Sequence, residues 1–158
     1  MIELPVIDCF TDENKFIRLE EVLNEFIKSK NSSQKKFCSI CGEEVEIYRT
    51  RKIYSTPNCL ILYLNNCVDG YYNNIKLSPP KKLDMSKYMN RTNQSGDFSL
   101  VGAIEYLGTG KRGHYIAECY NFIKGDNKWY LFNDEITEET KVEDIDSPII
   151  LFYEKNKN

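Results

Sequence analysis

The sequence has little of several residue types, and each shortage excludes a class of protein. Its 158 residues include one histidine and one tryptophan, and 21 lysines and arginines are outnumbered by 24 aspartates and glutamates, giving a net charge of −3. A nucleic-acid-binding protein needs a concentrated basic face to neutralise phosphates. No apolar run approaches the roughly 18 residues of a membrane span, and residues 1–8 lack a signal-peptide pattern. We therefore expect no nucleic acid and no membrane as partners, and a cytoplasmic or nuclear protein.

The composition is that of a globular domain with a substantial core. Hydrophobic residues make up 41% of the chain, charged residues 28% and aromatic residues 13%. A chain of this length buries roughly two-thirds of the surface that its unfolded state exposes. The many tyrosines and phenylalanines predict a core or a binding surface built from large, flat side chains.

Hydrophobic periodicity predicts one helix followed by a mainly antiparallel β assembly, an α+β fold. Apolar residues at helical spacing lie at Leu19, Val22, Leu23, Phe26 and Ile27. Residues 30–36 are polar and predict a connector. Short aromatic and β-branched runs, separated by turn residues, predict strands over 44–53, 59–64, 98–106, 114–122, 128–132 and 149–153. The expected core is Leu60, Leu62, Leu64, Leu100, Ile104, Ile116, Trp129, Leu131, Ile150 and Phe152.

The single histidine, His114, follows a glycine-rich stretch and opens a predicted strand. Gly113 before it has no Cβ, so another backbone, such as that of an extended peptide substrate, can pass close to the imidazole. About twenty residues later a strand ends in Asn133 and Asp134, which can accept a hydrogen bond from an imidazole N–H. Such an acceptor fixes the tautomer and leaves the other ring nitrogen free to act as a base. Without it, a lone histidine is an ordinary surface or core residue.

Hairpin geometry supports this pairing. The predicted strands 114–122 and 128–132 are joined by a turn over Lys124-Gly125-Asp126-Asn127, so their outer ends meet. His114 opens the hairpin and Asn133 follows its close. The spacing of the two residues and the pairing of the two strands therefore agree.

These residues resemble a known family. Gly113-His114-Tyr115, Trp129 and Phe132-Asn133-Asp134 are similar to the histidine box of the ubiquitin-specific proteases, papain-like cysteine proteases that remove ubiquitin from proteins. Further segments resemble that family in the same order, among them Leu4-Pro5-Val6, the helix at 19–26, Phe37 to Cys41, Tyr54 to Leu64, Leu83 to Tyr88 and Ile149 to Glu154.

The resemblance implies a partial ubiquitin-specific protease fold, with a finger region over 1–57 and a palm with the histidine box over 58–158. It implies that His114 is the general base, that Asn133 orients it, and that Asp134 supports or replaces Asn133. Gly110, Gly113 and Tyr115 would contact the substrate, in part through a loop over 107–112. Ubiquitin or ubiquitinated proteins would be the partners, together with a missing N-terminal half.

Departures from the family pattern concern the nucleophile and the metal. The six cysteines include none in the context of the family's cysteine box, and Cys9, which precedes the helix, is a poor candidate. Cys38 and Cys41 have the spacing of zinc ligands and resemble half of the family's four-cysteine site. No cofactor is required for the chemistry, and zinc is expected only if another segment supplies a second cysteine pair.

Three interpretations remain open from the sequence. The chain is part of a deubiquitinase, inert without a nucleophile supplied by another segment. Alternatively, it is a catalytically inactive relative that binds ubiquitin or acts as a scaffold. The third interpretation is an unrelated β-rich zinc-knuckle domain in which the glycine, histidine and tyrosine coincide by chance.

Overall fold

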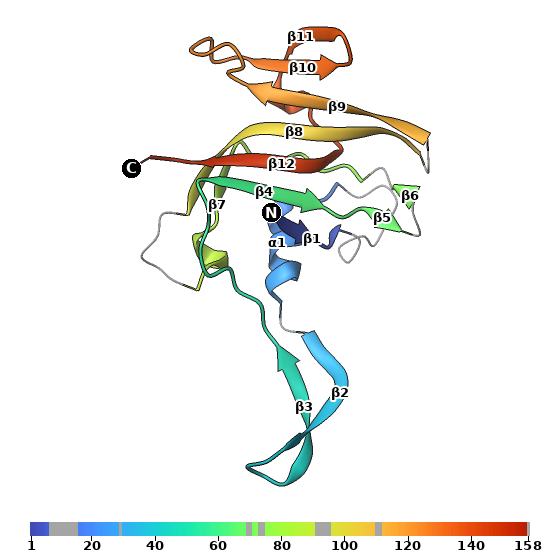
Figure 1. Ribbon diagram of the computed structural model, residues 1–158, viewed down its shortest axis with the longest axis vertical. Helices are drawn as coiled ribbons and strands as arrows, with labels where there is room; N and C mark the ends of the chain where they lie inside the picture. Colours follow the sequence, from blue (N-terminus) through green and yellow to red (C-terminus); the bar gives the residue numbers. More distant parts are fainter. Residues whose placement is uncertain are drawn as a thin grey trace.

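The computed structural model describes residues 1–6, 16–28, 30–68, 71–72, 75–90, 96–109 and 112–157. The main element of the fold is one eight-stranded sheet with the order β1-β4-β12-β8-β9-β10-β11, in which β7 also pairs with β8 (Figure 1). Its strands are β1 (Ile2–Leu4), β4 (Cys59–Leu64), β7 (Lys82–Asp84), β8 (Asp97–Thr109), β9 (Arg112–Tyr120), β10 (Trp129–Asn133), β11 (Ile136–Thr140) and β12 (Pro148–Lys155). Every pairing is antiparallel except that of β1 with β4. The expected α+β class is confirmed.

One α-helix, α1 (Leu19–Ile27), packs against β1, an edge strand of the sheet. Its buried residues, Leu19, Val22 and Leu23, follow the helical repeat that the sequence shows. Glu20 and Glu21 lie in the first turn, where negative charge favours the positive end of the helix dipole. Two short 3₁₀ helices, η2 (Ser86–Tyr88) and η3 (Val142–Asp144), lie in the connections.

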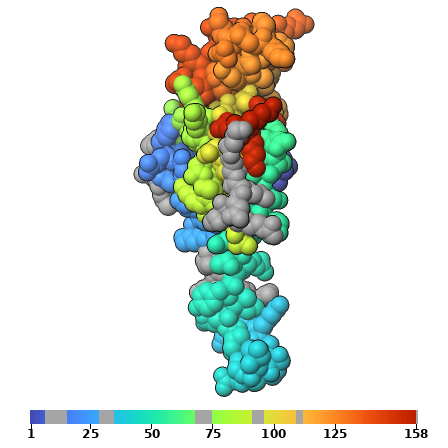
Figure 2. All heavy atoms as spheres, turned by 90° about the vertical axis from the view of Figure 1, so that its left-hand side faces the viewer, coloured from blue at the N-terminus to red at the C-terminus, as the bar shows by residue number. Residues whose placement is uncertain are grey.

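A separate two-stranded ribbon, β2 (Lys30–Cys38) and β3 (Glu43–Arg49), projects away from the sheet (Figure 1) and forms the narrow end of the molecule (Figure 2). The expectation of a polar connector over 30–36 is therefore wrong. Pairing with β3 places these residues in a strand, although lysine, asparagine and serine are poor strand formers. A third, smaller sheet pairs β5 (Cys67–Val68) with β6 (Tyr71–Tyr72).

The core corrects the expected faces of two strands. Leu60, Leu62, Leu64, Leu100 and Ile116 are buried as expected. In β12, however, Leu151 and Tyr153 are fully buried and take the places expected for Ile150 and Phe152. All five residues from Ile149 to Tyr153 are apolar, so the alternation that assigns faces is absent from the sequence.

The buried face of β8 also differs from the expected one, because the register between β8 and β12 shifts. Gly102 pairs with Phe152 and Leu100 pairs with Tyr153, so Val101 is an extra residue in β8. Leu100 and Ala103 thus share the buried face, while Ile104 is only partly buried. The remaining expected core residues, Trp129 and Leu131, are also partly buried, and Trp129 packs against the core.

Three strands of the main sheet were absent from the sequence-based expectation. β1 and β7 have three residues each, and β11 has the sequence Ile-Thr-Glu-Glu-Thr, in which little apolar character marks a strand. These segments are strands because they pair with β4, β8 and β10, respectively, rather than because of their own composition. Within the described ranges, no helix is long and apolar enough to cross a membrane.

Candidate functional site

The histidine and its acceptor lie at one end of the β9–β10 hairpin. His114 Nε2 is 2.6 Å from Asn133 Oδ1. An amide oxygen only accepts hydrogen bonds, so Nε2 carries the proton and donates it. Nδ1 is then the unprotonated nitrogen, with a lone pair available for a proton. About 42% of the His114 side chain is exposed, so a reacting group can reach the ring.

The strand register produces this contact. Phe132 pairs with Ala117 and Trp129 pairs with Tyr120, so the start of β9 meets the end of β10. His114 and Asn133 both lie an odd number of residues from this Phe132–Ala117 pair, so they point to the same face of the sheet. A slip of one residue in the register would send them to opposite faces.

Asp134 is a second, more distant acceptor. Its Oδ2 is 3.8 Å from His114 Nε2, and its side chain is 80% exposed. It is the first residue of the two-residue turn between β10 and β11, where it has a φ of +51°. Aspartate tolerates this left-handed conformation better than most residues. Asp134 therefore places negative charge near the imidazole without competing for its closest hydrogen bond.

A tyrosine fills the space beside Gly113. A Cβ on Gly113 would lie 2.1 Å from Cζ and 2.4 Å from the hydroxyl of Tyr106. The ring of Tyr106 is buried and lies 5.1 Å, centroid to centroid, from the ring of Tyr115. The structure thus gives Gly113 a second role that the sequence did not indicate: it admits an aromatic ring on the face opposite His114.

The other expected substrate contacts are only partly described. Tyr115 is 52% exposed and Leu107, opposite His114 in the strand pairing, is 47% exposed. Leu107 shares the face of His114 at the end of the β8–β9 hairpin, whereas Tyr115, the next residue along β9, points to the opposite face, beside Tyr106. Gly110 lies outside the described residues.

No cysteine in the part of the chain that the structure describes hydrogen bonds to His114. Cys119 is on β9, but burial raises the pKa of its thiol, which disfavours the reactive thiolate. Its Sγ donates to the carbonyl of Tyr120. Cys59 is exposed at the start of β4, where it pairs with Glu154 rather than with the histidine strand. Cys9 lies outside the described ranges.

Cys38 and Cys41 lie at the far tip of the β2–β3 ribbon. The turn between them is closed by a hydrogen bond from the Gly42 N–H to the Cys38 carbonyl, and Gly42 has a φ of +73°. Hydrogen bonds from the backbone N–H groups of Cys41 and Ile40 lower the pKa of the Cys38 thiol, which favours the thiolate that a metal requires. Among the described residues, no cluster of three or more candidate ligands includes this pair or any other.

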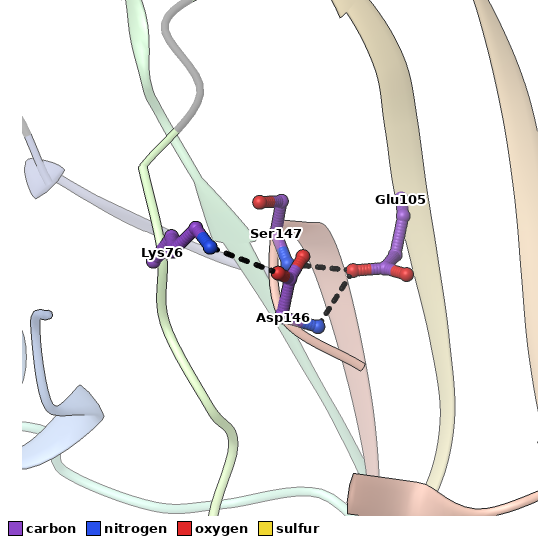
Figure 3. Close-up of polar contacts among 4 residues, drawn as sticks. All are labelled: Lys76, Glu105, Asp146 and Ser147. Atoms are coloured by element: carbon purple, nitrogen blue, oxygen red, sulfur yellow. Dashed lines mark hydrogen bonds and ion pairs between the residues drawn. The ribbon is translucent and has the colours of Figure 1, made fainter. Parts of the chain in front are cut away.

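Two buried glutamates lie on β8 and β9, the strands of the hairpin that carries His114. Glu105 Oε1 accepts hydrogen bonds from the backbone N–H groups of Asp146 and Ser147, at 3.0 and 2.6 Å, and Asp146 lies 3.8 Å from Lys76 Nζ (Figure 3). Glu118, on the neighbouring strand β9, is equally buried. Burial first, and then the negative charge of Glu105, raise the pKa of Glu118 to about 8. Glu118 is therefore mainly protonated at neutral pH.

Comparison with known protein families gives one match over most of the chain. The family model for ubiquitin carboxyl-terminal hydrolases matches residues 11–153. The chain is 29% identical to ubiquitin carboxyl-terminal hydrolase 10 of Arabidopsis thaliana over 131 aligned positions, covering 75% of this chain and 14% of that protein. It is 26% identical to ubiquitin carboxyl-terminal hydrolase 8 of Saccharomyces cerevisiae over 169 aligned positions, covering 94% of this chain and 35% of that protein.

Solved structures give the same fold. The SAGA DUB module Ubp8/Sgf11/Sus1/Sgf73 bound to ubiquitin aldehyde contains a chain with a TM-score of 0.79 and 23% identity, covering 99% of this chain and 36% of that chain. The same module bound to monoubiquitin gives a TM-score of 0.80 and 24% identity, covering 99% and 35%. This chain thus spans about a third or less of the proteins that it matches.

Proposed function

Because the chain belongs to the ubiquitin carboxyl-terminal hydrolase family, we propose that it is part of a thiol-dependent deubiquitinase, to which it contributes the base and the amide that orients it. The observation that supports this most is the 2.6 Å contact between His114 Nε2 and Asn133 Oδ1. It leaves Nδ1 as the nitrogen that takes a proton from a thiol. The third interpretation, an unrelated zinc-knuckle domain, is excluded by the family match.

The proposed chemistry begins when His114 Nδ1 takes the proton of a cysteine thiol supplied by another segment. The thiolate attacks the carbonyl carbon at the end of ubiquitin, and the imidazolium returns the proton to the leaving lysine amine as the C–N bond breaks. Water, deprotonated by the same imidazole, then hydrolyses the thioester and releases ubiquitin and the thiol. Asn133 holds the ring in one orientation throughout and fixes its tautomer when it is neutral, and Asp134 stabilises the imidazolium.

We propose ubiquitin and ubiquitinated proteins as the partners, in the cytoplasm or nucleus. The exposed side chain of Leu107, on the same face as His114, would contact the ubiquitin tail, Gly113 would line its path, and Tyr115 would contact ubiquitin from the opposite face of the strand. Gly110 would belong to the loop over the tail. Two of the similar solved structures contain bound monoubiquitin or ubiquitin aldehyde, which supports ubiquitin as the ligand of this fold.

By itself, the chain should be inert. No described cysteine contacts the histidine. Loss of the nucleophile or the base in a well-studied protease costs a factor of about 10⁶ in turnover. A segment that completes the catalytic site must bring both the thiol and donors for the oxyanion of the tetrahedral intermediate.

A ubiquitin probe with a cysteine-reactive group at its C-terminus tests the proposal. It is applied to this chain and to the chain joined to a segment that carries a cysteine box, with the His114→Ala form of the joined protein as the control. We expect covalent labelling of the joined protein only, and much slower labelling of its His114→Ala form. Equal labelling of the joined protein with and without His114 would show that the histidine does not activate the thiol.

A second function rests on the same observation, that no described cysteine hydrogen bonds to His114. The chain would then be a catalytically inactive relative that binds ubiquitin or acts as a scaffold. Non-covalent ubiquitin binding by this chain, combined with no labelling of any joined protein, would favour this alternative.

For Cys38 and Cys41 we propose half of a structural zinc site. Their two sulfurs would provide two of four tetrahedral ligands, and the second cysteine pair would come from another segment. When bound, the metal would tie the ribbon to that segment and take no part in the reaction. Titration of this chain with zinc should show weak binding, because two thiolates alone make a poor site.

A further inference from the structure

A groove of about 470 Å³ lies at the end of the β9–β10 hairpin away from His114, where β9 ends and β10 begins. Its lining comes from four parts of the chain: 81–82, 99–100, the two sides of the β9–β10 connection (120 and 127–129), and 139–143. Tyr120 is six positions after His114 on β9, or about 20 Å along an extended strand. The groove is therefore outside the proposed catalytic site, and its volume lies within the range of ligand-binding pockets.

Two aromatic rings form an apolar wall of the groove. Tyr120 and Trp129 pair across β9 and β10, with ring centroids 5.7 Å apart and planes at 45°. The Tyr120 hydroxyl donates to Asn127 Oδ1 at 3.1 Å, which fixes the tyrosine ring. Trp129 is only partly buried, and its indole N–H has no hydrogen-bond partner among the described residues. An aromatic wall with a free donor is typical of protein-binding sites.

The rim of the groove carries an excess of positive charge. Four lysines line it, and two of them are neutralised: Lys128 Nζ is 2.6 Å from Glu139, and Lys81 Nζ is 2.6 Å from Glu143. Lys82 and Lys141 are exposed, and within the described ranges neither forms an ion pair. The chain as a whole has a net charge of −3, so this local positive charge departs from the rest of the molecule.

We propose that this groove binds a short acidic segment of a partner or substrate protein, in which an aromatic or leucine-like side chain is flanked by aspartates or glutamates. The apolar side chain would pack on Trp129 and Tyr120. The flanking carboxylates would pair with Lys82 and Lys141, and a backbone carbonyl of the segment would accept from the Trp129 indole N–H. The groove would thus recruit a protein at a distance from the bond that is cleaved.

The only tryptophan of the chain lies in the groove, so its fluorescence reports occupancy. The probe is a blocked peptide, acetyl-Glu-Asp-Glu-Leu-Phe-Asp-Glu-amide, and its control has Gln and Asn in place of every Glu and Asp. We expect a saturable change in Trp129 emission with the acidic peptide only, with an affinity that falls as salt screens the lysines. No saturable change, or equal affinity for the two peptides, would overturn the proposal.

Reversing the charge of the rim lysines tests whether the acidic peptide binds in the groove. The double variant Lys82→Glu/Lys141→Glu should weaken binding of the acidic peptide at least tenfold, while the matched double variant Lys35→Glu/Lys36→Glu on the distant ribbon leaves its affinity unchanged. All four lysines are exposed, so we expect each variant to fold, which circular dichroism checks. Equal loss in both variants would show non-specific attraction and overturn the proposal. These experiments involve neither His114 nor a thiol, so their failure leaves the proposed catalytic function untouched.

Discussion

Two acceptor side chains lie beside the imidazole of His114, and they differ in how closely they approach it. Asn133 Oδ1 is 2.6 Å from Nε2 and belongs to a strand, whereas Asp134 Oδ2 is 3.8 Å away on an exposed turn residue. Orientation of the ring requires a short, directional contact, because hydrogen bonds weaken steeply with distance and misalignment. Asn133 is therefore the orienting residue in our proposal, and Asp134 acts through its charge.

Substitution of these two residues separates their roles. In the protein joined to a cysteine-box segment, Asn133→Ala should lower kcat/KM for a fluorogenic ubiquitin substrate by about 10²–10⁴-fold, because the ring loses its fixed tautomer. Asp134→Ala should cost less than about tenfold, since it removes only a screened charge. A larger loss for Asp134→Ala than for Asn133→Ala would reverse the assignment.

Gly113 offers a test of packing next to the site. Gly113→Ala places a Cβ 2.1 Å from Tyr106 Cζ, so the ring or the strand must move. We expect a loss of about 1–3 kcal/mol in the free energy of unfolding, measured by urea denaturation. The double variant Gly113→Ala/Tyr106→Val should recover part of this loss. Unchanged stability of the single variant would contradict the contact.

Among the strands, β8 and β9 combine the histidine with a buried pair of carboxyl groups. Glu105 binds the backbone at the start of β12, and Glu118 lies beside it with a pKa raised to about 8. In the unfolded chain a glutamate has a pKa of about 4.3. Below that pH both states carry the proton. As the pH rises, the unfolded chain loses it first, so stability falls from about pH 4 to about pH 8 and then levels off.

Glu118→Gln should remove this dependence. The variant keeps the shape and a hydrogen-bond donor but has no charge to bury. At pH 7.5 we expect it to be more stable than the original chain by at least ~1 kcal/mol, and at pH 4 to differ little from it. Urea denaturation at both pH values measures the difference, and Glu138→Gln on the exposed side of β11 serves as the control. A constant difference across the pH range would rule out ionisation as the cause.

The β2–β3 ribbon is a separate sheet that pairs with no strand of the main sheet. Isolated two-stranded ribbons are marginally stable, and this one exposes Phe37, Ile40 and Tyr48. In this chain alone, amides of Glu43–Arg49 should exchange with deuterium much faster than those of Cys59–Leu64, which lie in the sheet interior between β1 and β12. Hydrogen exchange read by mass spectrometry gives both rates. Equal protection would mean that the ribbon is stable without a further segment.

Sequence patterns predicted some elements better than others, for physical reasons. β4 alternates between buried and less buried positions from Leu60 to Leu64, and its bounds agree with the expected strand. β12 is apolar at every position from Ile149 to Tyr153, so only its register with β4 and β8 decides which face is buried. β2 is polar along most of its length, and its pairing with β3 was not visible in its composition.

At the scale of the whole molecule, the two candidate sites also differ in how far the sequence predicts them. His114 and Asn133 are 19 residues apart within one hairpin, so turn and strand lengths are enough to bring them together. The groove lined by Tyr120 and Trp129 is built from four parts of the chain between residues 81 and 143, which only the folded sheet brings together. Local pairing can be read from a sequence, whereas a surface built from distant segments requires the fold.

The sole histidine of the chain allows the most direct test of the central claim, that Asn133 fixes the tautomer of a catalytic imidazole. With no other imidazole in the spectrum, ¹⁵N NMR of the neutral ring reports which nitrogen carries the proton. We predict the Nε2–H tautomer, with a shift toward a mixture of tautomers in Asn133→Leu. An Nδ1–H tautomer, or a spectrum that Asn133→Leu leaves unchanged, would contradict the claim.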